Sequence, residues 1–519
     1  MARNVEPIKG TVGAVAALFV VAAVLSAFVG IGLRVTTVSG LGPAEWQAIR
    51  FTMLQSLLSA LFSCALAVLV ARALARRRFW GRSFLITLLG APFILPVIVA
   101  MLGLLAIFGR SGILNDFLGF LGFAEVSIYG LQGVVLAHVF FNLPLATRLL
   151  VQGWQGVPSE RYRLIAQLGM RPAMVFRLIE GPLLLRILPG AFALIFVICL
   201  TSFAVALTLG GGPRATTIEL AIYQAFRFDF DLGRAALLSL IQLCVAGGAA
   251  GLAFWLIPTV SFGGGMDRMQ KRWDVKGGSC SVLDGFFIAM ASGFLILPIL
   301  AIVLSGISGL SQVPAVVWGT AWTSLWVALL SVVVLLGLSL PMAGWIAASK
   351  RTSVEAIGLL GLAVSPLMIG TGWFILIHPF ADPTDWALLV TIVVNALMAL
   401  PFALRILVPS LRETVQTYGR LSGAIGLSGL TFWLWVLLPR SRQQIGFAAG
   451  LTGALSVGDL GVIALFADPD RATLPLQMYR LMGNYRTDAA AGAALILLVL
   501  AFGLFWIMDY WGRRDAIAE

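Results

Sequence analysis

One acidic side chain, that of Asp459 in the stretch SVGDLGV, falls inside a long apolar run. An ionised carboxylate is costly to hold in an apolar medium, so a residue of this kind is a candidate for a functional site. Its negative charge would suit a cation moving along a pathway. Two alternatives stay open: the outer third of the run is wet, or the carboxylate pairs with a basic residue elsewhere in the chain.

The other reactive side chains show no catalytic arrangement. His138 and His378 have no further ligands at metal-binding spacing, so packing and hydrogen bonding are favoured over metal coordination. Nucleophiles, acids and metal ligands do not cluster in the apolar runs, and nothing resembles the phosphate-binding pattern GxxxxGK[ST]. We therefore expect no enzyme activity, no catalytic residue, no metal site and no cofactor in this chain.

The elements that carry these residues are membrane-spanning helices. Of the 519 residues, 60% are hydrophobic and 11% are charged, against roughly 25% charged residues in an average soluble domain. Continuous apolar runs of about 20 residues are typical of helices that cross a bilayer, not of barrel strands. The sequence predicts an all-α polytopic membrane protein with twelve spans, at about 12–33, 51–71, 85–108, 129–150, 187–209, 234–257, 285–307, 322–347, 355–377, 386–408, 445–466 and 489–509.

The distribution of basic residues predicts the orientation. A cytoplasmic N-terminus puts 24 of the 35 Lys and Arg residues inside and nine outside, with two at span ends, as the positive-inside rule requires. Both termini are then cytoplasmic. Basic clusters at 72–82 and 268–276 face anionic lipid headgroups, so the net charge of +12 indicates contact with membrane lipids and no nucleic-acid partner.

The chain also resembles itself. At an offset of 257, Leu143-Pro144 aligns with Leu400-Pro401, and the match continues without a gap to residues 182 and 439. Further upstream the offset is about 268, where Gln55-Ser56-Leu57 faces Thr323-Ser324-Leu325. Two homologous six-helix halves, related by an axis along the membrane normal, are the natural interpretation. We assign them to residues 1–260 and 284–519, joined by a cytoplasmic linker at 261–283.

Each half carries one long cytoplasmic segment, at 158–183 and at 412–440. A short helical stretch ends at a glycine, Gly169 or Gly426, and a proline, Pro182 or Pro439, follows 13 residues later. Glycine permits a left-handed turn, and proline is expected to interrupt the helix that returns to the bilayer. The pattern predicts a helix–turn–helix that projects from the membrane. The alternative is that these segments are ordinary connecting helices, in which Gly and Pro only mark the helix ends.

These segments resemble the cytoplasmic coupling motif of ABC importer permeases, Glu-Ala-Ala, three residues, Gly, nine residues, Ile-x-Leu-Pro. We call them the first coupling loop (158–183) and the second coupling loop (412–440). The Glu-Ala-Ala positions depart from the pattern, with Arg163-Leu164-Ile165 and Arg420-Leu421-Ser422. The candidate coupling residues are Gly169, Met170, Arg171, Ile179 and Pro182, and Gly426, Leu427, Val436 and Pro439. The resemblance implies the type I importer permease fold and two copies of a cytoplasmic ATPase subunit, which would bind the ATP and Mg²⁺.

A longer resemblance concerns the substrate. The stretches GLQGVVLAHVFFNLPLATRLL and LGGGPRATTIELAIYQAFRFDFDLGRAALLSLIQ look like the fused permeases of the thiamine and thiamine pyrophosphate importer, and the similarity extends over about residues 50–510. It implies a bacterial inner-membrane protein that works with a periplasmic thiamine-binding protein. Ferric iron permeases share this architecture and stay open as an alternative. An ion-coupled secondary transporter is a further one, although such proteins usually carry more charges at membrane depth.

The outer loops hold the remaining candidates. By the family resemblance, the outer face receives the binding protein, in docking that is usually polar and charge-assisted. Helix capping and loop solvation are the alternative roles for each residue. The candidates for docking or for the pathway are Arg214, Thr216, Tyr223, Arg471, Thr473 and Tyr479, together with Asp459.

Overall fold

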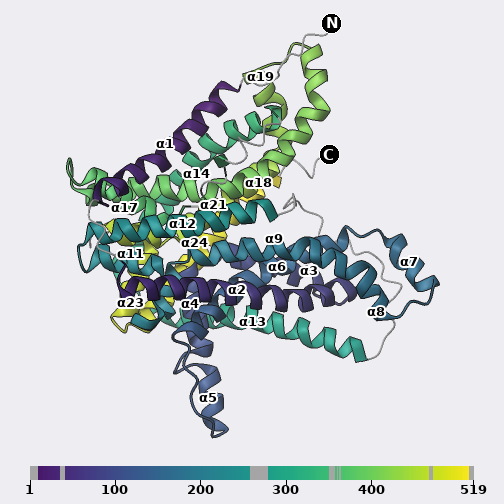
Figure 1. Cartoon of the computed structure of the whole chain (residues 1–519), viewed down its shortest axis with the longest axis horizontal. Coiled ribbons are helices and arrows are strands. Elements are labelled where there is room, and N and C mark those ends of the chain that lie inside the picture. Colours follow the sequence, from purple (N-terminus) through teal and green to yellow (C-terminus); the bar gives the residue numbers. More distant parts are fainter. Residues whose placement is uncertain are drawn as a thin grey trace.

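The computed structural model describes residues 10–35, 41–256, 279–349, 357–358, 361, 364–466 and 471–513. In this part of the chain the regular structure is helical throughout (Figure 1). Eleven helices are long and apolar enough to cross a membrane, and two shorter apolar helices cover residues 366–377 and 430–440. The prediction of an all-α polytopic membrane protein is confirmed.

The main helices follow the predicted spans. They are α1 (Thr11–Arg34), α2 (Pro43–Arg76), α4 (Val97–Phe108), α6 (Leu131–Gln155), α9 (Gly181–Leu200), α12 (Leu232–Leu256), α13 (Ser279–Gly309), α14 (Ala315–Ser349), α17 (Pro366–Ile377), α18 (Ala387–Ala424), α21 (Arg442–Val457) and α24 (Thr487–Arg513). The ninth predicted span, 355–377, is represented by α17, because most of residues 355–363 lie outside the described part. Residues 261–278 of the predicted linker also lie outside it, and α13 already begins at Ser279.

Short elements connect these helices. The α-helical ones are α3 (Arg82–Leu88), α5 (Ile113–Phe120), α7 (Ser159–Gln167), α8 (Pro172–Val175), α10 (Ala204–Leu209), α11 (Ile218–Arg227), α19 (Leu430–Phe432), α20 (Leu438–Arg440), α22 (Gly461–Phe466) and α23 (Leu474–Gly483). The 3₁₀ turns are η1 (Ala91–Phe93), η3 (Pro213–Ala215), η4 (Leu310–Gln312) and η5 (Pro383–Trp386). Figure 1 shows α11 and α23 at one end of the long helices, and α7, α8 and α19 at the other.

Several helices, among them α2, α14 and α18, are much longer than a bilayer requires. With 34 residues, α2 is about 50 Å long, against a hydrocarbon layer of roughly 30 Å. Its last turns therefore extend beyond the membrane and carry Arg72 and Arg76. With 38 residues, α18 likewise continues from its span to the turn at Gly426. The second coupling loop thus begins within α18, whereas the first follows α6 (Leu131–Gln155), and both loops lie at the same end of the long helices (Figure 1).

The first helix of each half packs against the other half. Helix α1 contacts α14 and α17, while α13 contacts α2 and α4. The crossing of α1 and α17 is made by small residues, since a methyl group built on Gly30 would collide with the carbonyl oxygen of Gly372. Small residues allow this close approach of backbones between membrane helices. The halves are therefore interlocked.

Hydrogen bonds across the bundle repeat in both halves. The hydroxyl of Thr52 in α2 accepts a bond of 2.9 Å from the backbone N–H of Ile218, at the start of α11. The hydroxyl of Ser324 in α14 accepts one of 2.8 Å from the N–H of Leu474, at the start of α23. The equivalent hydroxyls are 324 − 52 = 272 positions apart. In these helices the structural offset is thus 272, and not the 268 that the sequence alignment predicts.

The crossing of α1 and α17 allows a matched test. Replacing Gly30 with Leu forces a side chain into the carbonyl of Gly372 and should cost about 1–3 kcal/mol by overpacking. Gly32 has no atom of another residue within 4 Å of a built methyl group, so Gly32→Leu should leave stability unchanged. Thermal unfolding of the two detergent-solubilised variants checks this. Equal midpoints would contradict the interlocked packing.

Candidate functional site

The glycines of the two coupling loops make the same turn. Gly169 has φ +62° and Gly426 has φ +77°, so the predicted left-handed turns are confirmed. In both loops the next amide bonds back five residues, from Met170 to the carbonyl of Ile165 (3.2 Å) and from Leu427 to that of Ser422 (2.8 Å). This is the Schellman arrangement. A methyl group on either glycine would meet no atom within 4 Å, so the backbone conformation, not crowding, requires glycine.

The helical stretch before each turn exposes a pair of apolar side chains. Leu164 and Leu168 are 56% and 60% exposed in the first coupling loop, and Leu421 and Ile425 are 60% and 65% exposed in the second. Each pair is spaced i, i+4 and therefore lies on one face of its helix. Beyond the turn, Arg171 is exposed as well. Both coupling loops thus present an apolar face that the rest of the described chain leaves uncovered.

The prediction that proline interrupts the returning helix is wrong for the first loop, where α9 continues past Pro182, whereas in the second loop the helix ends at Arg440, directly after Pro439. In each loop a π-helical turn, η2 (Phe176–Glu180) or η6 (Trp433–Leu437), comes just before the proline. The N–H of Gly181 bonds the carbonyl of Phe176, and the N–H of Leu438 bonds that of Trp433, both five residues back. In the first loop the widened turn accommodates the proline ring and its missing N–H, and the helix continues to Leu200. In the second loop a turn at Ser441 separates α20 from α21.

The motif residues around these turns occupy similar environments in both loops. Ile179 and Val436 lie within the π-helical turns and are half-buried. Pro182 and Pro439 follow the turns and are exposed. Met170 and Leu427, which come directly after the glycines, are also half-buried. The two sets of coupling residues are therefore equivalent in position as well as in sequence.

At the centre of the bundle two predicted spans are broken. The span 187–209 is divided into α9 and α10 around 201–203, and the span 445–466 into α21 and α22 around 458–460. The second break faces Pro96, which precedes α4 in the other half, because a methyl group on Gly458 would lie 2.8 Å from its Cβ. Interrupted helices at corresponding positions of two repeats are typical of transport pathways.

Asp459 lies in the second of these breaks. Its Oδ1 accepts a bond of 3.3 Å from the backbone N–H of Gly461, at the start of α22. Its Oδ2 is buried and bonds no group in the described part of the chain. Within that part no basic side chain pairs with it, so the predicted alternative of an ion pair is not observed. One oxygen of the carboxylate therefore remains available within the bundle.

Polar side chains close to the breaks join three helices in each half. His138 of α6 bonds Ser59 of α2 through Nδ1 (3.2 Å), while Asn142 donates to the sulfur of Cys199 in α9 (3.3 Å). In the second half Asn395 of α18 donates to Ser456 of α21 (2.8 Å), which donates to Ser331 of α14 (3.0 Å). Such bonds hold membrane helices together, and they give His138 the structural role that the sequence favours.

At the end of the bundle opposite the coupling loops, the sequence candidates divide into exposed and buried residues. Arg214 is exposed in η3, and Arg471 is 43% exposed while pairing with Asp385 at 2.8 Å. Thr216 and Thr473 are buried, the latter as the N-cap residue of α23. Arg214 and Arg471 are therefore the candidates whose charged side chains are accessible at the surface.

Two tyrosines from the short helices α11 and α23 lie near one another. Tyr223 of α11 packs against Phe203 and Phe228, with ring centroids 5.2 and 5.9 Å apart. Burial raises the pKa of Tyr223 and of Tyr479 in α23, and the nearby Tyr223 phenol raises that of Tyr479 further. The structure thus brings candidates of both halves together at this end of the bundle.

Sequence reasoning missed two fully buried carboxylates, Glu180 and Glu219. Glu180 ends the π-helical turn of the first coupling loop, at the position of the motif that tolerates any residue. Glu219 lies in α11 beside Ser365 and Gln242, and burial raises its pKa to about 8. Both are single acidic residues in helices with an apolar face. The criterion applied to Asp459 would have identified them if it had been extended to short helices.

Comparison with known proteins gives a consistent result. No family model matches the chain. It is similar to thiamine transport system permease proteins of Salmonella typhimurium (39% identity, covering 91% of this chain and 90% of the relative) and Brucella abortus (39%, covering 89% and 87%). The protein of the same name from Haemophilus influenzae is 33% identical, with 92% and 93% covered.

Proposed function

The chain belongs to the family of thiamine transport system permease proteins, and we propose that it is the permease subunit of a bacterial ATP-driven importer for thiamine and its phosphates, including thiamine pyrophosphate. The single observation that carries the proposal is the similarity to these relatives over about nine-tenths of the chain. The family works with an ATPase partner and a substrate-binding protein. This chain is a transport subunit and not an enzyme.

The proposed partners match features at the two ends of the bundle. Two copies of a cytoplasmic ATPase, holding ATP and Mg²⁺, would each receive one coupling loop, because each loop exposes an apolar pair beyond the membrane. At the other end, a periplasmic thiamine-binding protein would dock near Arg214 and Arg471. This arrangement puts the chain in the inner membrane with both termini in the cytoplasm, as the excess of basic residues on that side favours.

The proposed mechanism is alternating access. The halves, 1–260 and 284–519, would rock about the two-fold axis between them while the central pathway opens to one side at a time. The breaks between α9 and α10 and between α21 and α22 support this proposal, since interrupted helices supply polar backbone groups inside a membrane bundle. ATP binding and hydrolysis in the partner would drive the change through the coupling loops.

The decisive experiment reconstitutes this chain in liposomes with its cognate ATPase and binding protein. We expect thiamine or thiamine pyrophosphate to stimulate ATP hydrolysis and to be taken up, and ferric ion to do neither. If ferric ion alone stimulates hydrolysis, the chain is still the permease of an importer, but its substrate is ferric iron and not thiamine. Uptake driven by an ion gradient without ATP would overturn the importer.

The coupling residues have a direct test. Val at both 169 and 426 must adopt a left-handed conformation that costs roughly 1–2 kcal/mol per residue, although neither site is crowded. We expect the Gly169→Val/Gly426→Val protein to insert normally and to transport at least about tenfold less thiamine per ATP hydrolysed. Gly319→Val, at an uncrowded position in a helix, is the control. Unchanged transport in the double variant would remove the coupling assignment.

Asp459 is proposed to contact the cationic substrate in the pathway. A hydrogen bond to a charged group contributes about 1.5–3 kcal/mol, so Asp459→Asn should reduce transport efficiency about tenfold or more, with insertion and assembly unchanged. Asp459→Glu, which keeps the charge, should recover part of the loss. Initial uptake rates over a range of thiamine concentrations measure both. A silent Asp459→Asn variant would leave Asp459 with a structural role only.

A further inference from the structure

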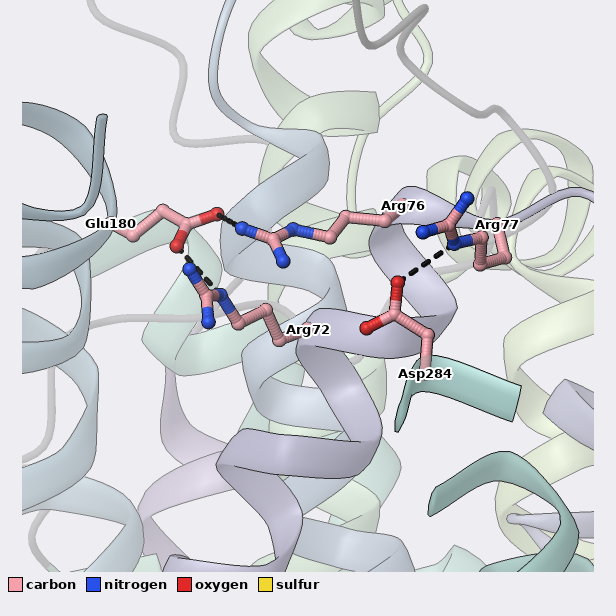
Figure 2. A network of polar contacts seen from close by, with 5 residues as sticks. All are labelled: Arg72, Arg76, Arg77, Glu180 and Asp284. Atoms are coloured by element: carbon pink, nitrogen blue, oxygen red, sulfur yellow. Dashed lines mark hydrogen bonds and ion pairs between the residues drawn. The ribbon is translucent and has the colours of Figure 1, made fainter. Parts of the chain in front are cut away.

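The first coupling loop is tied to α2 by ion pairs. Glu180, whose side chain has no exposed surface, accepts a bond of 2.8 Å from Nε of Arg72 and a contact of 3.4 Å from Nη2 of Arg76 (Figure 2). These arginines lie one turn apart in the last part of α2 and converge on one carboxylate. A buried charge is tolerated only when it is paired in this way. The position of the loop relative to α2 is thus strongly specified.

Arg72 also contacts the beginning of the π-helical turn. The guanidinium of Arg72 lies over the ring of Phe176, 5.6 Å from its centroid. Phe176 starts η2 and Glu180 ends it. One residue of α2 therefore contacts both ends of the widened turn, at the point where the loop returns to the membrane.

The end of α2 also reaches the second half. Arg77 donates to Asp284 of α13 at 2.7 Å (Figure 2). Asp284 is almost buried and belongs to the first helix of the second half, which packs against α2 and α4. Three successive contacts, from the loop to α2 and from α2 to α13, thus connect the first coupling loop with both halves.

At the positions equivalent to Arg72, Phe176 and Glu180, the second half has an apolar joint instead. At the structural offsets of 272 and 257, Arg72 corresponds to Gly344 (344 − 72 = 272) and Phe176 to Trp433 (433 − 176 = 257). Trp433 packs directly on Gly344, since a methyl group there would collide with its ring. Leu437 stands at the position of Glu180 (437 − 180 = 257) and is fully buried. An apolar joint is non-directional, whereas the ionic joint has fixed partners and geometry.

We propose that Glu180 is a positioning residue that couples the first loop rigidly to α2 and α13, so that the two coupling loops transmit the ATP cycle unequally. This inference rests on the proposed import function. Movement of the first loop would carry the end of α2 and, through Arg77 and Asp284, the first helix of the second half. The second loop would act on α14 through the apolar contact of Trp433 with Gly344, which lacks the fixed partners of the ionic joint.

Two measurements on the reconstituted complex test the proposal. For Glu180→Gln we expect thiamine-stimulated ATP hydrolysis within about twofold of the original, and thiamine transported per ATP lower by about tenfold. Hydrogen–deuterium exchange should become at least about tenfold faster in the first coupling loop and stay unchanged in the second. The control is Asp509→Asn, which removes the carboxylate of an ion pair with Arg513 near the C-terminus and should change neither quantity.

The outcomes separate a positioning role from a merely structural one. Unchanged transport per ATP in Glu180→Gln, or equal loosening of both loops, would overturn the proposal. If that variant does not insert, Arg72→Leu/Arg76→Leu/Glu180→Leu removes all three charges, and it should insert and still lose coupling. Full coupling in this triple variant would overturn it equally. If the original chain shows no thiamine-stimulated hydrolysis, the proposed function fails, whereas the exchange measurement still tests the joint.

Discussion

The structure depends on one constraint, that backbone polar groups inside a bilayer must be hydrogen-bonded within the protein. Helices meet this requirement by themselves, and any break in them must be enclosed by other parts of the chain. The break between α21 and α22 is enclosed in this way, with Gly458 against Pro96 of the other half. In the second half, the irregular backbone therefore lies where the two halves meet, which is where the proposed pathway runs.

The first helix of each half packs on the other half, beside this central region. Because α1 packs on α14 and α17, and α13 on α2 and α4, neither half can move without displacing a helix of the other. The close crossing at Gly30 and Gly372 makes this contact short and specific. Each half is then a unit with its neighbour's first helix attached, so a displacement at the coupling-loop end of one half would also move a helix of the other.

The coupling loops show how a repeat keeps its geometry while its chemistry diverges. Their Schellman turns and their π-helical turns agree bond for bond. Yet behind these turns the first half has arginines and a buried glutamate, and the second has glycine, tryptophan and leucine. The ATPase partners would meet similar surfaces, whereas the membrane helices behind those surfaces would receive the movement through different joints.

The sequence by itself determined the features that depend on neighbouring residues. Long apolar runs predict membrane helices, and Gly169 and Gly426 predict left-handed turns, because hydropathy and backbone freedom act over a few positions. The long matching stretches likewise indicated the family. The twelve predicted spans were placed well, except that 85–108, 187–209 and 445–466 are interrupted by turns and 355–377 is only partly described.

Only the tertiary structure decided which distant groups meet. Arg72 and Glu180 are 108 residues apart, and Arg77 and Asp284 are 207 apart, so no local pattern relates them. The same holds for the contact of Gly458 with Pro96 and for the crossing of α1 with α17. Even the π-helical turns escaped prediction, because proline usually ends a helix unless the surrounding packing favours a widened turn. Local sequence specifies segments, whereas burial and pairing follow from how all the segments pack together.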